Sequence, residues 1–424
     1  MTLTLFVLMM VLLLGSVPVY VSLGLSATVV LALFTSLPLE VLAQRMFSGI
    51  DKFSLMAVPF FILAANVMKG GGLSIRILKL AQALVGHYKG GLAMTVVLAC
   101  MFFGAVSGSS PATVIAIGGL MLPALRQANY GESFTLGLIT SSSAVAVIIP
   151  PSIGMIVYGS VTGTSVGDLF MAGIGPGILF GGVFIIYSYY HAKKHKIETL
   201  KRANAKEIWF AFKEAGWALG IPVLILGGIY GGFFTPTEAA AVASVYAIFV
   251  SLFIYKDLRL KGLWDETYES AIGTAQVMIL LAAASVFSWL LTRQQVPQAM
   301  TEALMAISNS KFAILLMINV LLLITGMFID PASSTTILAP LLLPLALSYG
   351  IDPVHLGIIM VVNGAIGMYT PPFGLNLFVA TGISTVSISR IIQGVIPFII
   401  LSLITMALVT YLPIISLWLP QMMK

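Results

Sequence analysis

The chain has 424 residues, of which 59% are hydrophobic and only 8% are charged, and its formal net charge is +6. Soluble domains carry about 25% charged residues, so this composition excludes an ordinary soluble protein. A membrane β-barrel would alternate apolar and polar residues in ~10-residue units, but apolar runs such as 7–14 and 314–323 do not alternate. The sequence therefore predicts an all-α polytopic membrane protein with roughly ten or more helical spans.

Basic residues mark one side of the membrane. Fourteen of the 21 Lys and Arg residues lie in 69–89, 193–213 and 256–261, and the positive-inside rule places these stretches in the cytoplasm. They are too dispersed for a nucleic-acid surface, so solvated loops are the simpler interpretation. One cysteine, Cys100, gives no disulfide framework, and four scattered His residues argue against a transition-metal site.

The first quarter of the chain alternates spans with interfacial segments. Two spans lie within 3–36 and are joined at about 15–19. Mixed polar and apolar residues over 38–52 predict a helix in the membrane interface. A span at 53–68 follows, and then a second interfacial helix over 69–89.

Segment 91–125 is about 35 residues long, which suits two short antiparallel helices. It is interrupted by small residues, Ser107-Gly108-Ser109-Ser110-Pro111, and Gly and Pro end a helix while small side chains let ions approach backbone carbonyls. We therefore predict a re-entrant hairpin whose tip is buried in protein or lines a polar cavity. A plain span with a proline kink is the alternative.

Segment 132–161 carries a different break. Ser141-Ser142-Ser143 precede the pair Pro150-Pro151, which removes two backbone donors and frees carbonyls upstream. This pattern predicts a discontinuous helix. A span at 170–190 then completes the first half, and 191–213 forms the main cytoplasmic loop.

The middle of the chain leads into a repeat of the first half. Spans at 217–233 and 239–255 are joined by a turn at 234–238, in which Glu238 could cap the next helix, and 256–268 is amphipathic and cytoplasmic. The second half comprises a span at 271–291, an arm at 292–308, a hairpin at 311–347, a helix at 355–381 broken at 367–376, and a last span at 389–419.

The prolines support an internal duplication. A shift of 221 residues carries four of the five prolines between 101 and 178 onto prolines: Pro123, Pro150, Pro151 and Pro176 onto Pro344, Pro371, Pro372 and Pro397. With 20 Pro in the chain, random placement would match about one in twenty. Crossings counted from the 191–213 loop make the halves inverted and place both chain ends in the periplasm. Interrupted segments at matching places in two halves indicate the substrate site of a secondary transporter.

The breaks also offer ligands for Na⁺, which needs several oxygens in place of its water shell. Carbonyls and hydroxyls make neutral cages suited to monovalent cations, whereas carboxylate-rich sites favour Ca²⁺ or Mg²⁺. The predicted ligands of the first half are Ser107, Gly108, Ser109, Ser110, Ser142, Ser143 and the carbonyls before Pro150. Those of the second half are Gly326, Asp330, Ser333, Thr370 and Asn376. Close helix packing and helix capping are the alternative roles for these small residues.

Two charged residues near the second hairpin are candidates for substrate binding. Asp330 stands between apolar runs, and a carboxylate at membrane depth is costly and therefore a functional candidate. Its alternative role is to cap the following helix. Arg293 could clamp a carboxylate bidentately or could be an ordinary snorkelling residue. Asn66 and Asn363 are more simply explained as interhelical hydrogen-bond partners.

The sequence resembles the large membrane subunit (DctM-like) of tripartite ATP-independent periplasmic (TRAP) transporters over essentially its whole length. The resemblance rests on several motifs in order: RMFSGIDKFSLMAVPFFILAANVM (45–68), GGLAMTVVLACMFFGAVSGSSPAT (90–113), IPPSIGMIVYG (149–159), FTPTEAAAVA (234–243), GMFIDPAS (326–333) and YTPPFGLNLFV (369–379). The family's hairpin tips match 107–113 and 326–334, and its broken helices match 148–154 and 367–376. The family's substrate-site Arg and hairpin Asp match Arg293 and Asp330.

The resemblance implies a function. Members are similar to elevator-type, Na⁺-coupled secondary transporters of the bacterial inner membrane, with no enzymatic activity and no cofactor besides Na⁺. They take organic acids, such as C4-dicarboxylates or sialic acid, from a periplasmic binding protein. They work with a small four-helix membrane subunit, expected here as a separate chain because the sequence begins at the large-subunit pattern. The scaffold would comprise 1–90 and 191–310, arms included, and the transport domain 91–190 and 311–424.

Three other functions compete with this prediction. A stand-alone dicarboxylate or citrate carrier of similar inverted-repeat design would work without a binding protein. An intramembrane hydrolase using a Ser of the 107–110 cluster would need a nearby base, and no His lies inside an apolar segment. A channel fits poorly, because two occluding hairpins favour alternating access.

Overall fold

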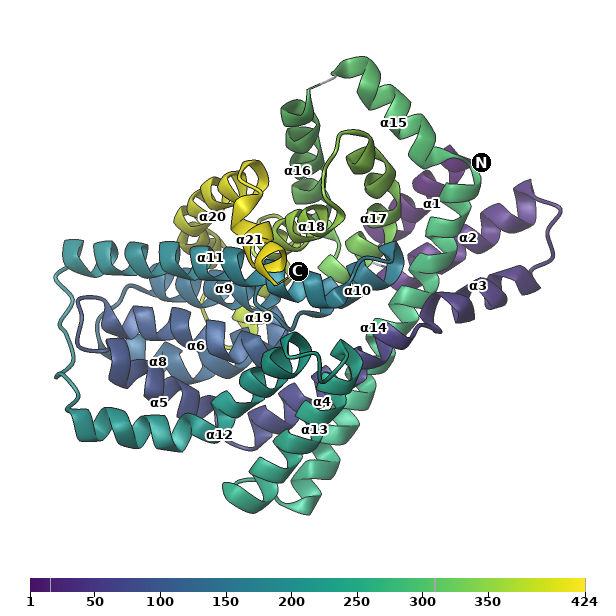
Figure 1. Cartoon of the computed structure of the whole chain (residues 1–424). Coiled ribbons are helices and arrows are strands. Elements are labelled where there is room, and N and C mark those ends of the chain that lie inside the picture. The colour runs from purple at the N-terminus through teal and green to yellow at the C-terminus, as the bar shows by residue number, and fades with distance from the viewer. Residues whose placement is uncertain (16, 309, 424) are drawn as a thin grey trace.

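The computed structural model describes residues 1–15, 17–308 and 310–423, with 304–307 described by backbone alone. Every regular element in these ranges is a helix. Nine helices of the described chain are long and apolar enough to cross a membrane. Figure 1 shows them as one interlocked assembly. The predicted all-α polytopic fold is confirmed.

The first five helices match the predicted spans and interfacial segments. They are α1 (Thr2–Leu14), α2 (Val19–Phe34), α3 (Glu40–Ile50), α4 (Ala57–Gly70), which follows a short 3-10 turn η1 (Phe53–Met56), and α5 (Leu73–Val85). Leu5 of α1 and Ala27 of α2 are buried in a cluster with Phe287, far along the chain. The N-terminal pair is therefore packed against the long helix α14 (Leu260–Arg293).

The first repeat contains the predicted hairpin and broken helix. Its elements are α6 (Gly91–Ser107), α7 (Ser110–Thr113), the π-turn η2 (Val114–Gly118), α8 (Gly119–Gln127), α9 (Glu132–Ile148), α10 (Ile153–Thr162) and α11 (Val166–Lys194). The hairpin runs down α6 and returns through α7, η2 and α8. The Pro150-Pro151 pair separates α9 from α10, as predicted from the loss of two backbone donors.

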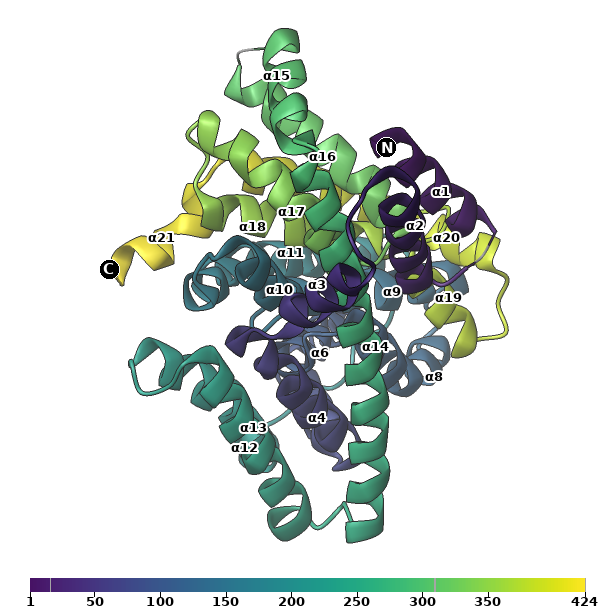
Figure 2. The ribbon, with the colours of Figure 1, turned by 90° about the vertical axis from the view of Figure 1, so that its right-hand side faces the viewer.

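The middle of the chain differs from the prediction at one element. It contains α12 (Ala205–Tyr230), α13 (Pro236–Phe249), the π-turn η3 (Val250–Ile254), α14 and α15 (Val296–Ile307). The predicted span at 271–291 is part of the longer, 34-residue helix α14, which begins at Leu260 and so includes most of the segment 256–268 that we predicted to be amphipathic. Figure 2 shows α14 running past α4 along much of the molecule's height.

The second repeat follows the order of the first. Its elements are α16 (Lys311–Phe328), α17 (Pro331–Ser348), α18 (Pro353–Gly367), α19 (Leu375–Gly382), α20 (Ile388–Tyr411) and α21 (Ile414–Met422). Hairpin α16–α17 and broken helix α18–α19 correspond to α6–α8 and α9–α10. The prediction of one last span at 389–419 was wrong, because Leu412 and Pro413 interrupt it.

Two equivalent helices form the centre of the fold. Nearly every residue of α9 and α18 is buried, including polar ones such as Ser142 and Asn363. A helix that is apolar around its whole circumference belongs in the interior, and the two sequences meet this condition. The rings of Phe134, Phe184 and Phe398 join α9, α11 and α20 at centroid distances of 5.2–6.0 Å. The broken helices are therefore held in the most rigid part of the molecule.

Two glycines allow α9 and α20 to approach closely. A Cβ atom at Gly137 would lie 2.2 Å from the Gly394 carbonyl oxygen, and one at Gly394 would lie 1.8 Å from the Ser133 carbonyl oxygen. Neither distance is compatible with a side chain, so the backbones would have to separate.

Gly137→Ala should therefore lower the stability of the purified protein by ~1–3 kcal/mol, the usual cost of overpacking. The thermal unfolding midpoint in detergent measures this. Gly182→Ala on α11 is the control, because a Cβ there meets nothing within 4 Å. An unchanged midpoint for Gly137→Ala would show that the close crossing does not constrain the fold.

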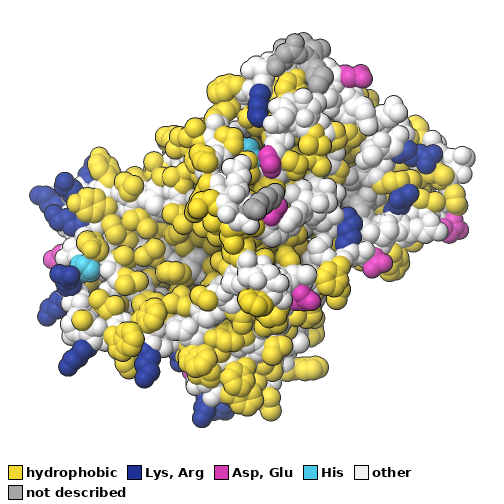
Figure 3. Space-filling model, in the orientation of Figure 1, with side chains coloured by type: hydrophobic (Ala, Val, Ile, Leu, Met, Phe, Trp, Pro, Cys, Tyr) yellow, Lys and Arg dark blue, Asp and Glu magenta, His cyan; other side chains and the backbone are white. Residues whose placement is uncertain are grey.

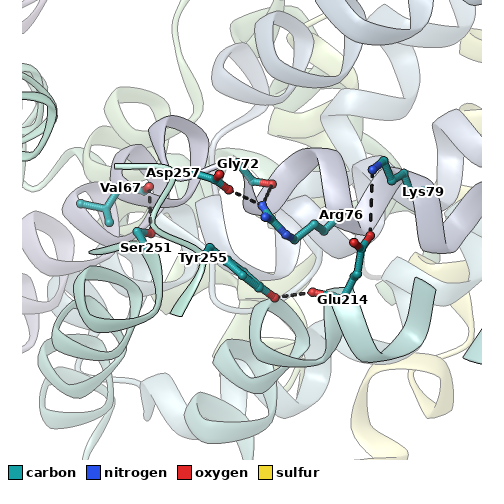
Figure 4. Close-up of polar contacts among 8 residues, drawn as sticks. All are labelled: Val67, Gly72, Arg76, Lys79, Glu214, Ser251, Tyr255 and Asp257. Atoms are coloured by element: carbon teal, nitrogen blue, oxygen red, sulfur yellow. Dashed lines mark hydrogen bonds and ion pairs between the residues drawn. The ribbon is translucent and has the colours of Figure 1, made fainter. Parts of the chain in front are cut away.

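A polar cluster ties α5 to its neighbours (Figure 4). The Arg76 guanidinium pairs with Asp257, donates to the Gly72 carbonyl at 3.0 Å and lies 3.8 Å from the centroid of the Tyr255 ring. The Tyr255 hydroxyl donates to the Glu214 carbonyl on α12. These contacts connect α5 to the segment before α14, and that segment to α12.

Basic side chains collect at one end of the molecule. Figure 3 shows Lys and Arg concentrated at the left end, where Figure 1 places the connection from α11 to α12. Hydrophobic side chains cover most of the remaining surface in this view. The distribution matches a protein embedded in lipid with its basic end in the cytoplasm.

Candidate functional site

The tip of the first hairpin lies against the first Pro-Pro break. Gly108 ends α6 with φ 55°, a left-handed conformation that favours glycine. A Cβ there would lie 2.8 Å from the carbonyl oxygen of Pro151. Beyond it, the Ser107 hydroxyl lies 3.4 Å from that of Thr113, which donates to the Ser109 carbonyl. The structure thus brings the predicted tip and the predicted helix break together.

Asn376 connects the two halves of the chain at this place. Its amide nitrogen donates to the Ser110 hydroxyl at 2.6 Å and to the Thr140 carbonyl at 3.1 Å. Our grouping of Asn376 with the second hairpin was wrong, because its bonds go to the first hairpin and to α9. Asn376 therefore links the second break to the first hairpin and to α9.

Several buried side-chain oxygens of α9 and of the two breaks have no hydrogen-bond partner. In the described chain they include the side-chain oxygens of Thr140, Ser141, Ser142 and Ser152, and Oδ1 of Asn376. An unsatisfied buried polar atom costs about 1–3 kcal/mol. Such a cost calls for an explanation, and a bound cation or ordered water is one. Ser143 differs, because its hydroxyl donates to the Ile139 carbonyl at 2.7 Å.

The second hairpin tip lies against the end of α18. A Cβ at Gly367 would lie 2.5 Å from the Gly326 carbonyl oxygen, so both glycines are needed for this contact. The Phe328 and Phe373 rings meet at 5.5 Å between centroids. The Thr370 hydroxyl donates back to the Ile366 carbonyl at 2.6 Å. The second hairpin and the second break are brought together as predicted.

Asp330 caps α17, which was the alternative that the sequence left open. Its Oδ1 accepts hydrogen bonds from the backbone N–H groups of Ala332 and Ser333, both at 3.0 Å. The Ser333 hydroxyl donates to Oδ2. A carboxylate at a helix N-terminus is stabilised by the unpaired N–H groups and the helix dipole.

Arg293 ends α14 and is exposed. Its guanidinium carbon lies 5.7 Å from the centroid of the Trp289 ring, and that of Arg45 lies 4.8 Å from the same ring. Arg293 therefore shares the Trp289 ring with Arg45 at the end of α14.

The remaining candidates take structural roles. Glu238 completes a capping box with Thr235 at the start of α13. Asn66 donates to the Ser270 hydroxyl at 2.9 Å, and Asn363 donates to Asn319 Oδ1 at 2.7 Å. These interpretations are confirmed. Sequence reasoning missed Thr140, Ser141 and Ser152 as site residues, although their positions beside the Pro-Pro break were a usable signal.

The helix ends around the site favour ions of both signs. The ends of α6 and α9 present carbonyls with no intrahelical partner, and α10 and α19 begin at the breaks with N–H groups that no side chain caps. Carbonyl ends attract cations and N-termini attract anions. In the described ranges no three His, Cys, Asp or Glu side chains gather as metal ligands. The chemistry is therefore that of neutral oxygens and helix dipoles.

Two helical hairpins and two broken helices that meet inside an apolar helical protein are typical of a membrane transport protein. The comparisons give the family. Residues 6–415 match the family described as tripartite ATP-independent periplasmic transporter, DctM component. The chain belongs to this family, which consists of transport subunits and not of enzymes, and it is a multi-pass inner-membrane protein.

Relatives share most of the chain. It is 42% identical over 435 residues to the C4-dicarboxylate TRAP transporter large permease protein DctM of Rhodobacter capsulatus, covering 99% of both chains. It is 45% identical to the isethionate TRAP transporter permease protein DctMQ of Oleidesulfovibrio alaskensis, covering 95% of this chain and 64% of that relative. Other relatives are permeases named for sialic acid and for ectoine.

A solved structure shares the fold. The crystal structure of the YdaH transporter of Alcanivorax borkumensis superposes with a TM-score of 0.69 and 15% identity, covering 95% of this chain and 98% of that one. At this identity the likeness concerns the fold alone.

Proposed function

We propose that this protein carries an organic anion into the cell together with Na⁺, and that a periplasmic binding protein delivers the anion. The observation that carries the sodium part is the set of unpartnered buried oxygens beside Asn376, Ser110 and Thr140. Neutral oxygens next to carbonyl ends of helices suit Na⁺. The relatives named for C4-dicarboxylate, isethionate and sialic acid support an anionic substrate.

The transport mechanism in this proposal is that of an elevator. Residues 91–190 and 311–424 form the moving domain, and 1–90 and 191–310 form the scaffold with its two arms. The burial of α9 and α18 supports a rigid unit that could move as one body. The small membrane subunit is a separate chain in this proposal, although one relative carries the name DctMQ.

Uptake into proteoliposomes tests the proposal. The protein is reconstituted with its small subunit and binding protein, and labelled succinate, N-acetylneuraminate and isethionate are offered in turn. We expect at least one acid to accumulate when a Na⁺ gradient is imposed, and none under a K⁺ gradient of equal size.

Two outcomes would contradict separate parts of the proposal. Undiminished uptake without the binding protein would favour a stand-alone carrier. Uptake driven by a pH gradient alone would replace Na⁺ with protons as the coupling ion.

A further inference from the structure

A cavity of about 230 Å³ lies beside α14, away from the hairpin tips. One wall comes from α14 and the end of α3, with Ser285, Trp289 and Lys52. The opposite wall comes from α10 and α17, with Val157 and Thr336. Helix α17 packs against both α14 and α10, and Figure 1 shows these three helices close together near the N-terminal helices. The cavity thus separates the predicted scaffold from both predicted transport repeats.

Lys52 crosses this cavity. Its ammonium donates to the Ser160 carbonyl at 2.7 Å, which is a contact between residues 108 positions apart. Ser160 lies in the last turn of α10, where carbonyls lack intrahelical partners and carry partial negative charge. The ion pairs found in the described chain join other residues, and none includes Lys52. An ammonium group has three N–H donors, and the structure gives a partner to one.

Lys52 is the one charged side chain among the described residues that line the cavity, and the exposed Asp51 before it in the chain is not among them. No Asp or Glu side chain is among the described residues that line the cavity. Trp289 of the wall carries the guanidinium groups of Arg45 and Arg293 over its ring. Partial burial lowers the pKa of the Lys52 ammonium, because desolvation disfavours a charge that no carboxylate balances. An ammonium group in a cavity without a lining carboxylate attracts an anion, and the exposed guanidinium groups over Trp289 add to the positive potential.

We propose that Lys52 binds the carboxylate or sulfonate group of the transported anion and exchanges the Ser160 carbonyl for it. This inference rests on the proposed uptake of organic anions. An ammonium group binds an oxygen of opposite charge more strongly than a neutral carbonyl oxygen, so the anion displaces the Ser160 carbonyl. The exchange frees α10 from the segment that joins α3 to α4. Substrate binding would then release a contact between the two parts of the protein.

Lys52→Gln tests the binding role. The variant removes the charge, and we expect the KM of uptake to rise about 10- to 100-fold, which is the range for loss of one hydrogen bond to a charged group. Lys52→Arg should restore most of the affinity. Lys311→Gln is the matched control, because Lys311 also donates to a backbone carbonyl, that of Gly350 at 2.9 Å, but does not line this cavity.

The outcomes separate this inference from the proposed function. If the wild type takes up none of succinate, N-acetylneuraminate and isethionate, the proposed function fails and the inference falls with it. If the wild type takes up an acid and Lys52→Gln has an unchanged KM, only the inference fails. A lower kcat or less folded protein at constant KM would mean that Lys52 is only a cap for α10.

The distance between the two walls of the cavity tests whether Lys52 exchanges the Ser160 carbonyl for the anion. Spin labels are placed at Asp51→Cys and Val161→Cys in a Cys100→Ser background, which leaves Lys52 intact. We expect the label distance to lengthen when the transported acid is added, and the lengthening to disappear in Lys52→Gln. An unchanged distance in the wild-type background at saturating acid would overturn the exchange.

Discussion

Asn376→Ala should remove most of the stabilisation that Na⁺ gives to the purified protein. Asn376 joins the second break to Ser110 of the first hairpin and to Thr140 of α9. Loss of its amide leaves the Ser110 hydroxyl and the Thr140 carbonyl without this donor, at a cost of about 1–3 kcal/mol in any salt. It also removes Oδ1, one of the unpartnered oxygens that a cation would use.

The thermal unfolding midpoint in NaCl, KCl and choline chloride at equal ionic strength separates these effects. A ligand at 100 times its Kd stabilises the folded state by about 2.7 kcal/mol, which is large enough to measure. The wild type should show this increment in NaCl only. Asn376→Ala should lose it and should also unfold earlier in all three salts.

Asn66→Ala provides the matched control. Asn66 is also an amide that bonds a Ser hydroxyl on another helix, at 2.9 Å, but it lies between α4 and α14. It should lower the midpoint equally in the three salts and keep the sodium increment. If Asn376→Ala keeps the increment as well, the ion does not bind beside Asn376.

The elements that could be predicted from the sequence are those that a residue's own backbone geometry determines. Gly108 and Pro111 end and restart a helix wherever they lie, and the Pro150-Pro151 pair removes donors regardless of the fold. Because the prolines recur after a shift of 221 residues, we predicted the same kinds of break in the second half. The hairpins and broken helices follow from these signals alone.

The bonds of Asn376 could not be predicted in the same way. The repeat suggests that each hairpin associates with the break of its own half, and the glycine contacts of Gly108 and Gly326 follow this rule. Asn376 departs from it because the two halves interlock, and a contact between residues 266 positions apart is decided by tertiary packing. No periodic pattern in the sequence indicates which distant residue Asn376 will contact.

The pattern of charged residues did not reveal two features of the structure, the start of α14 and the contact made by Lys52. The charged residues of 256–268 indicated an amphipathic segment but not that it continues into the span at 271–291 as one helix, α14, which begins at Leu260. Lys52 looked like part of an interfacial helix. Its contact with the Ser160 carbonyl depends on how α10 packs, which composition does not reveal.

Asp330→Asn should leave the protein folded while reducing Na⁺-driven uptake at least 100-fold. Asn and Asp are nearly equal as N-cap residues, so the amide oxygen can still accept the Ala332 and Ser333 N–H groups. The variant removes only the negative charge and one acceptor oxygen. If that carboxylate binds Na⁺ or orients the substrate, transport fails without a loss of stability.

Asp352→Asn is the matched control for this experiment. Asp352 also precedes a proline and caps α18 through Oδ1, which accepts from Val354 N–H at 2.7 Å and His355 N–H at 3.3 Å. It lies between the second hairpin and α18, away from the hairpin tip. Both variants should unfold near the wild-type midpoint, but only Asp330→Asn should lose uptake.

Asp330→Ala then separates capping from charge. Loss of the cap costs about 0.5–2 kcal/mol, so this variant should be less stable than Asp330→Asn and equally inactive. Wild-type uptake by Asp330→Asn, measured beside a destabilised Asp330→Ala, would reduce Asp330 to a helix cap. The sodium site would then have to be built from the neutral oxygens around Asn376 alone, because Asp330 is the one carboxylate among the candidate ligands of the two hairpin tips.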